Sequence, residues 1–140
     1  MNEVDLSGEV KRWLRYARED LHAAEWMLEE SDMIPRHACW LAQQSAEKAL
    51  KAVLVFLKID FPWTHDLDAL RNLIPGDWQL KAKHPDLADL SDWATEARYP
   101  GDLPDAVEAD ARAAVEKARV VWRSVCDDFA DRGFEGADVR

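Results

Sequence analysis

The stretch RHACWLAQQSAEKALKAVLVFLK, residues 36–58, decides the fold because it predicts one long helix to which the rest of the chain packs. It contains no glycine or proline, and most of its residues are Ala, Leu, Gln, Glu or Lys, which favour helices. Pro35 precedes it, at a position where a missing N–H costs nothing. Apolar and small side chains recur on one face and predict a core contact there. The residues of this face are Leu41, Ser45, Ala49, Leu50, Val53, Phe56 and Leu57.

The same helix carries a polar strip with a positive bias. Four basic residues and one acidic residue give the stretch a net charge of +3, whereas the whole chain carries −10. Two interpretations follow. Glu47 and Lys51 stand at a favourable i, i+4 spacing, which is typical of a solvated helix face. Alternatively, Lys48 and Lys51 belong to a surface that contacts phosphate.

Length and composition limit the class of protein. A chain of 140 residues fits a single domain, here with a core of about residues 8–130 and a flexible tail at 131–140. The acidic isoelectric point of about 4.8 argues against general binding to nucleic-acid backbones. The N-terminus lacks a signal-peptide pattern, and no apolar run approaches a membrane span. We therefore expect a cytoplasmic protein that is not bound to membranes.

The hydrophobic period predicts an all-α protein, an up-and-down helical bundle of three long and two shorter helices. Residues 1–7 are expected to fray, and residues 77–84 and 98–105 are expected to form loops. Thr64 is the expected N-cap of the third helix, Pro85 opens the fourth, and Asp105 and Glu108 begin the last. The expected helices span residues 7–30, 36–58, 64–74, 85–97 and 105–132.

The tryptophans and cysteines give further expectations about burial. Trp63 and Trp78 lie near helix breaks and are expected to be partly exposed. The other tryptophans in helical patterns are expected in the core: Trp13, Trp26, Trp93 and Trp122. Cys39 and Cys126 have no metal-binding spacing, so we interpret both as buried small hydrophobic residues in a reducing compartment.

The tetrapeptide THDL at residues 64–67 allows a metal site or a helix cap. A His-Asp pair is a hallmark of one group of helical metal-dependent phosphohydrolases, although such a site needs further ligands from elsewhere. The ligands in question are His37, His65, Asp66 and either Asp86 or Asp110. The simpler interpretation is that Thr64 caps the helix, that the negative charge of Asp66 is stabilised at the positive end of the helix dipole, and that His65 makes a local hydrogen bond.

Arg98 and Tyr99 begin the loop that contains Pro100 and Gly101. A guanidinium held at a helix end can clamp a phosphate with two hydrogen bonds. It can equally cap the last carbonyls of its own helix or pair with one of the many carboxylates. No glycine-rich phosphate loop, nucleophile elbow or Cys–His pair is visible in the sequence.

Three motifs in this order resemble the HEPN family, the higher eukaryote and prokaryote nucleotide-binding domain. They are QQSAEKALKA at 43–52, THDL at 64–67 and RYPG at 98–101, and the likeness extends over about residues 8–130. The resemblance implies a small helical bundle that forms homodimers and is often encoded beside a minimal nucleotidyltransferase, sometimes as the toxin of a toxin–antitoxin pair. By motif position it also implies a nucleotide- or partner-binding surface. The residues of that surface are Glu47, Lys48, Lys51, His65, Arg98 and Tyr99.

Some members of the family resembled are metal-independent ribonucleases that use an Arg followed four to six residues later by His. Arg98 matches the Arg, but no His follows His84 anywhere in this chain. The sequence thus favours a binding module for a nucleotide, an RNA or a nucleotidyltransferase protein, with no cofactor and no metal. A ribonuclease that recruits His65 as an unusual base beside Arg98, and the metal-dependent phosphohydrolase, are the alternatives.

Overall fold

The computed structural model describes residues 2–96, 100–101 and 104–134 and confirms the predicted all-α bundle, with no strand in those residues. Three helices are long and three are short, one short helix more than the sequence predicted. The helices are α1 (Glu3–Leu28), α2 (Pro35–Phe56), α3 (Leu67–Asn72), α4 (Gln79–Lys83), α5 (Ala88–Glu96) and α6 (Glu108–Asp131). Along this part of the chain, every helix is too short or too polar to span a bilayer.

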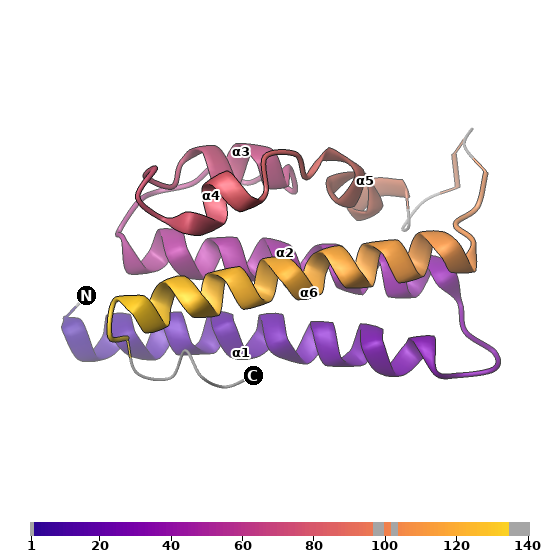
Figure 1. Ribbon diagram of the computed structural model, residues 1–140, viewed down its shortest axis with the longest axis horizontal. Helices are drawn as coiled ribbons and strands as arrows, with labels where there is room; N and C mark the ends of the chain where they lie inside the picture. The colour runs from indigo at the N-terminus through magenta and orange to yellow at the C-terminus, as the bar shows by residue number, and fades with distance from the viewer. Residues whose placement is uncertain (1, 97–99, 102–103, 135–140) are drawn as a thin grey trace.

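Helix α2 lies at the centre of the bundle (Figure 1). It contacts α1 and α6 along its length and also contacts α3 and α5. Helix α1 runs antiparallel to α2 and α6, while α3, α4 and α5 lie across the side of the bundle opposite α1 (Figure 1). Because neighbours cover it on several sides, α2 buries far more of its residues than a surface helix does.

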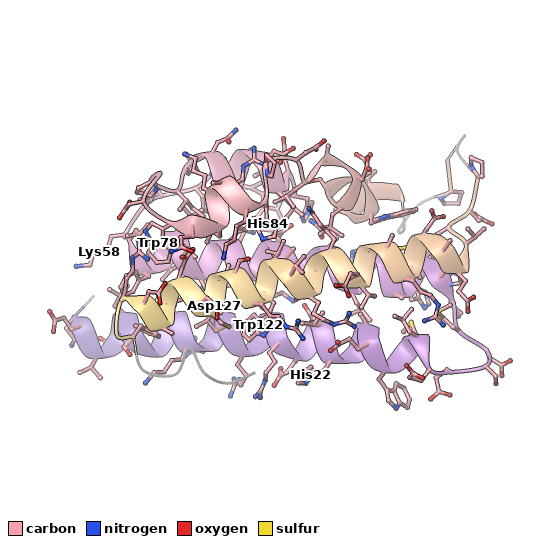
Figure 2. All side chains as sticks on the ribbon, in the orientation of Figure 1. His22, Lys58, Trp78, His84, Trp122 and Asp127 are labelled. Atoms are coloured by element: carbon pink, nitrogen blue, oxygen red, sulfur yellow. The ribbon has the colours of Figure 1, made fainter. Side chains whose placement is uncertain are left out.

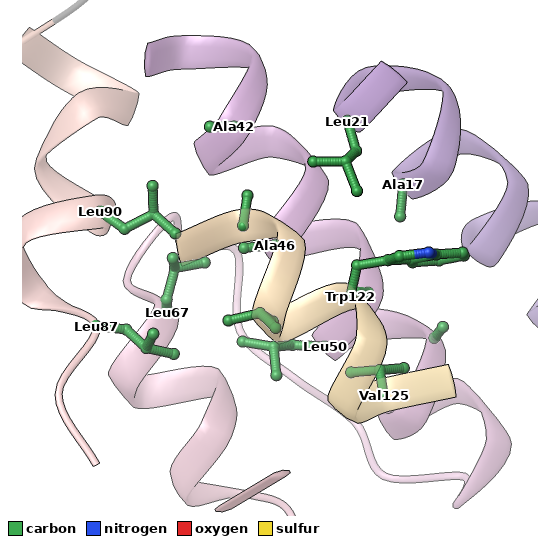
Figure 3. Packing of buried hydrophobic residues seen from close by; sticks show 14 of the residues in the cluster. Ala17, Leu21, Ala42, Ala46, Leu50, Leu67, Leu87, Leu90, Trp122 and Val125 are labelled. Atoms are coloured by element: carbon green, nitrogen blue, oxygen red, sulfur yellow. The ribbon is translucent and has the colours of Figure 1, made fainter. Parts of the chain in front are cut away.

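Small residues at the helix contacts let the three long helices approach closely. Figure 3 shows the side chain of Ala17 of α1 over the ring of Trp122 of α6, and both residues are buried. Ser45 of α2 is also buried, and its Oγ donates a hydrogen bond to the carbonyl of Ala17 at 2.8 Å. The large ring of Trp122 therefore fits between the helices because the side chain opposite it is small.

Several helices begin at other residues than predicted. Asn2 caps α1 by accepting from the N–H of Asp5 at 2.9 Å, so the helix starts at Glu3 and the prediction of a frayed N-terminus is wrong. Asp66, not Thr64, is the N-cap of α3 and accepts from the N–H groups of Asp68 and Ala69. The fourth predicted helix begins at Ala88 rather than Pro85, and the last begins at Glu108.

Helix α4 lies where a loop was predicted, because its N-terminus is satisfied from outside the segment. The buried carboxylate of Asp128 on α6 accepts from the N–H of Gln79 at 3.2 Å and of Leu80 at 2.8 Å. Trp78 is buried against Phe129, and its place beside the end of α6 is visible in Figure 2. The expectation that Trp78 is partly exposed is thus wrong.

Of the remaining predictions about tryptophan and cysteine, some are confirmed and one is wrong. Trp122 is buried and Trp63 is 88% exposed, as expected, but Trp26 is 68% exposed rather than in the core. Trp26 lies two residues from Ala24 and Leu28, which places it on the opposite side of α1 from the buried row. Cys39 and Cys126 are both buried, as predicted.

Candidate functional site

The polar strip of α2 is buried rather than solvated at its centre. Gln43, Glu47 and Lys51 follow one another at four-residue spacing, and the exposed fractions of these residues are 0%, 5% and 6%. They lie under the segment from Leu57 to Asp66, which connects α2 to α3 and carries Phe61, Trp63 and His65. The prediction of a solvated face is therefore wrong at these positions.

Glu47 is the centre of the hydrogen-bond network in this strip. Lys51 Nζ donates to its Oε2 at 3.0 Å, and Gln43 Nε2 donates to its Oε1 at 3.1 Å. His65 Nδ1 lies 2.8 Å from the same Oε1. Three side chains from two segments thus satisfy one buried carboxylate, as a buried charge requires.

The surroundings of Glu47 keep it ionised. Burial by itself would raise the pKa of this carboxyl group. The hydrogen bonds from His65, Gln43 and Lys51, together with the positive charge of Lys51, outweigh burial and lower its pKa below the ordinary value of 4.5. Glu47 is therefore a carboxylate at neutral pH, and His65 donates to it through a hydrogen on Nδ1.

This hydrogen bond fixes the orientation of the His65 ring. With Nδ1 bound to Glu47, the other ring nitrogen, Nε2, lies on the opposite edge of the imidazole and has no partner within the described residues. About a third of the His65 side chain, 34%, is exposed. Gln43 Nε2 also donates to the backbone carbonyl of His65 at 3.1 Å, so α2 holds both the ring and the backbone of this residue.

Aromatic rings surround the ammonium of Lys51. Its Nζ lies 5.8 Å from the ring centre of Trp13 on α1, 5.4 Å from Phe61 and 5.7 Å from Trp63. These distances allow cation–π attraction. Trp63 also meets the edge of the His65 ring, with 5.9 Å between ring centres. The site therefore has a buried ionic centre and an exposed indole and imidazole above it.

The structure brings together three of the six residues proposed for the binding surface: Glu47, Lys51 and His65. Lys48, one residue away from Glu47, forms an ion pair with Asp20 of α1. Arg98 and Tyr99, the remaining two, lie outside the described residues. The ring of His65 does not make the local hydrogen bond that was predicted for it, because its partner is Glu47 of α2.

A metal site does not form from the residues proposed for one. Within residues 2–96, 100–101 and 104–134, no group of three His, Cys, Asp or Glu side chains could hold an ion. Asp66 instead caps α3, and Asp110 accepts from the N–H of Val107 at the start of α6. These contacts favour the capping interpretation of the motif over the phosphohydrolase.

Four residues of the site were not singled out for it from the sequence: Gln43, Trp13, Phe61 and Trp63. Gln43 precedes Glu47 by four residues, which was a usable signal for a side-chain pair on one helix face. Trp13 and Phe61 come from distant segments, and only the packing of α1 and of the segment 57–66 against α2 brings them to Lys51.

Two other buried polar groups have structural partners. His84 Nε2 lies 2.9 Å from Ser124 Oγ on α6, and Arg71 donates to the carbonyl of His84 at 2.9 Å. Arg71 also pairs with Asp68, whose Oδ1 accepts from the N–H of Leu87 at 2.8 Å. These contacts join the short helices to each other and to α6, so we assign them to the fold rather than to the site.

Comparison with known proteins gives one family and one similar structure. The family model described as the HEPN domain matches residues 10–128. The crystal structure of TT1696 from Thermus thermophilus is similar to this chain, with a TM-score of 0.69 and 26% sequence identity. The similarity covers 85% of this chain and 97% of TT1696. No curated protein matches the chain. The residues matched by the family model include all of α2 and the segment that carries Trp63 and His65.

Proposed function

Because this chain belongs to the HEPN domain family, we propose that it binds nucleotides, free or within RNA, at the surface formed by Trp63 and His65. The observation that carries this proposal is the exposure of Trp63. An indole that is 88% exposed stabilises the fold little, yet its neighbour His65 is held in place by a buried carboxylate. A flat aromatic surface next to a fixed hydrogen-bonding group suits a nucleobase.

The buried residues support this site without contacting the ligand in the present conformation. Lys51 neutralises Glu47, so a phosphate near His65 meets no uncompensated negative charge from this carboxylate. The partly exposed Lys48 adds a cation nearby, although Asp20 shares it. The family resemblance is the reason for including Arg98 and Tyr99 in the binding surface. Lys51 thus serves as a positioning residue rather than as a direct phosphate contact.

The test is a titration of the purified protein with AMP and with a short single-stranded RNA, read by calorimetry. Stacking on tryptophan contributes about 1–3 kcal/mol per base, so Trp63→Ala should weaken binding between about 5- and 150-fold. Trp26→Ala removes another exposed tryptophan, near the end of α1, and is the matched control that should leave binding unchanged. Equal affinities of the two variants for both ligands would refute this site.

A second candidate function, metal-independent RNA cleavage, is favoured by the 2.8 Å contact between Glu47 and His65. A carboxylate that holds Nδ1 leaves Nε2 able to accept a proton, as in the pairing of acid and imidazole in many hydrolases. In the reaction, Nε2 takes the proton of a ribose 2′-hydroxyl and the 2′-oxygen attacks the adjacent phosphorus. The bond from phosphorus to the 5′-oxygen breaks, and that oxygen takes a proton from water.

Cleavage of labelled RNA in EDTA tests this second function, with DNA of the same sequence as the control because it has no 2′-hydroxyl. His65→Ala should abolish cleavage, and Glu47→Gln should lower its rate, since a neutral amide replaces the carboxylate that accepts from Nδ1 and orients the ring. Intact RNA after incubation with folded protein, or cleavage that survives in His65→Ala, would exclude the mechanism while leaving binding at Trp63 open.

The family resemblance also supports association with other chains. We propose a homodimer and, in its cellular context, a minimal nucleotidyltransferase protein as partner in a toxin–antitoxin pair. Light scattering tests the first part, since a mass near 16 kDa at all concentrations would exclude a dimer. Co-expression with nucleotidyltransferase proteins encoded beside it tests the second, and failure to co-purify with any of them would exclude that partner.

A further inference from the structure

A cavity between α5 and the first half of α6 lies apart from the site at Trp63 and His65. Its volume is about 540 Å³, which is within the range of cavities that bind small molecules. Figure 1 shows α5 beside this part of α6, and the two helices contact each other. The described residues that line the cavity include none from the proposed nucleotide site. The cavity therefore offers space for a second ligand with its own chemistry.

The floor of this cavity is apolar. Leu87, Leu90 and Ala114 line it and are buried, and the partly buried ring of Trp93 lies among the lining residues as well. A ligand that covers these side chains is stabilised by the hydrocarbon that it removes from water. The floor therefore favours a molecule with aliphatic groups over a small hydrated ion.

The charged residues that line the cavity are mostly acidic. Four aspartates and one lysine give them a net charge of −3: Asp86, Asp89, Asp92, Asp110 and Lys117. Asp89 and Asp92 are exposed, and neither accepts a hydrogen bond nor forms an ion pair with another described residue. Carboxylates gathered around one cavity attract cations and repel anions. The ligand that complements this cavity is therefore positively charged.

The arrangement of the aspartates suits an extended cation rather than a metal ion. In the part of the chain that the structure describes, no three His, Cys, Asp or Glu side chains could hold an ion together. Asp89 and Asp92 are three residues apart on α5 and so share a face, while Asp110 reaches the cavity from α6. A molecule whose positive charges are separated by hydrocarbon can place a different nitrogen at each carboxylate. The ring of Trp93 offers a further contact to an ammonium group.

We propose that this cavity binds a linear aliphatic polyamine, with its methylene groups on the apolar floor and its ammonium groups at Asp89, Asp92 and Asp110. The alternation of hydrocarbon and positive charge in such a molecule matches the floor and the aspartates around it. A lysine-rich peptide fits less well, because its backbone N–H and C=O groups would lose water against an apolar floor without gaining partners. The inference does not depend on nucleotide binding at Trp63.

The test is a calorimetric titration with spermidine at low ionic strength, where exposed charges are screened least. Asp89→Asn/Asp92→Asn should weaken binding about 2- to 30-fold, the range for the loss of two exposed ion pairs. Trp93→Ala should weaken it about 2- to 5-fold. Lys117→Gln should strengthen binding, because it removes a like charge from the cavity. An anionic ligand predicts the opposite sign for the lysine variant.

The matched control is Glu3→Gln/Asp5→Asn, which removes two exposed carboxylates from the first turn of α1, at the other end of the bundle from α5 (Figure 1). It should bind spermidine like the unmodified protein. Equal weakening by both double variants would show that only the net charge matters and would overturn the inference. Binding of butylamine as tight as that of spermidine would overturn it too, since one ammonium would then suffice. Tighter binding of tetralysine than of spermidine would assign the cavity to a basic segment of another protein instead. The affinity for AMP should be the same in all of these variants, so failure of spermidine to bind overturns this inference and leaves the proposed function standing.

Discussion

Replacement of Lys51 by Met should destabilise the protein because it leaves a carboxylate buried without its counterion. Lys51 Nζ lies 3.0 Å from Glu47 Oε2, and the two side chains are only 7% and 6% exposed. At this distance and an effective dielectric constant of about 20, the attraction is about 5 kcal/mol. Removal of one partner from a buried pair typically costs about 3–5 kcal/mol. Glu47 keeps its bonds to Gln43 and His65, so we expect a loss of about 3 kcal/mol.

The double variant Glu47→Gln/Lys51→Met separates this cause from lost packing. Met has about the length of Lys and an apolar side chain that suits the rings around position 51, and Gln keeps the shape of Glu. With both charges gone, the free energy of unfolding should return to within about 1 kcal/mol of the unmodified protein. A double variant as unstable as Lys51→Met would show that the packing of the lysine, not the ion pair, stabilises the site.

The pH dependence of the free energy of unfolding tests the same explanation independently. In the unmodified protein the pKa of Glu47 is below 4.5, so its contribution to stability is present above that pH and is lost as the pH falls further. In Lys51→Met the pKa of Glu47 should rise, because the cation is gone and burial remains. The penalty of the variant should therefore shrink in acid. Urea unfolding followed by tryptophan fluorescence at about pH 7 and about pH 5 measures both effects, and a loss below about 1 kcal/mol at neutral pH would refute the reasoning.

Three further predictions concern the fold. Burial and nearby cations lower the pKa of His84 from 6.5 to about 4. As the pH falls, the unfolded chain therefore binds a proton before the folded protein does. The free energy of unfolding should fall by about 3 kcal/mol between pH 6.5 and about pH 4, relative to the variant His84→Gln. Asp128→Ala leaves two N–H groups of α4 unpaired and should cost about 2–4 kcal/mol, with loss of hydrogen-exchange protection confined to α4 if the cap explanation holds. Ala17→Leu overpacks the contact with Trp122 and should lower the free energy of unfolding by about 1–3 kcal/mol, whereas a neutral effect would contradict the close approach of α1 and α6.

The fold was predictable where the sequence pattern and the tertiary contacts agree. Helix α2 and the row from Val10 to Ala24 on α1 repeat at three and four residues, and both form as that period predicts. Helix α4 was not predictable, because its first N–H groups are capped by Asp128, 48 residues further along the chain from Leu80. Trp26 shows a different limit: it lies within a helical pattern but off the buried face.

The candidate site was predictable only in part, for a related reason. The spacing of Glu47 and Lys51 predicted their ion pair. The sequence of a helix shows which side chains share a face, but it does not show which part of the chain covers that face. Here the cover is the segment 57–66, and its position depends on the hydrogen bonds of His65 with Glu47 and Gln43 of α2.

The position of the ionic cluster argues that it orients a functional surface. Because α2 is so buried, we expect it to be stable with apolar side chains at positions 43, 47 and 51, whereas charged residues there cost desolvation energy. The cluster holds the ring of His65 and the carbonyl of the same residue. Because Glu47→Gln/Lys51→Met should keep the fold while removing the anion that holds Nδ1, it separates the two roles. A purely structural cluster predicts no change in RNA chemistry, whereas an orienting cluster predicts that base stacking at Trp63 persists and that any proton transfer by His65 is lost.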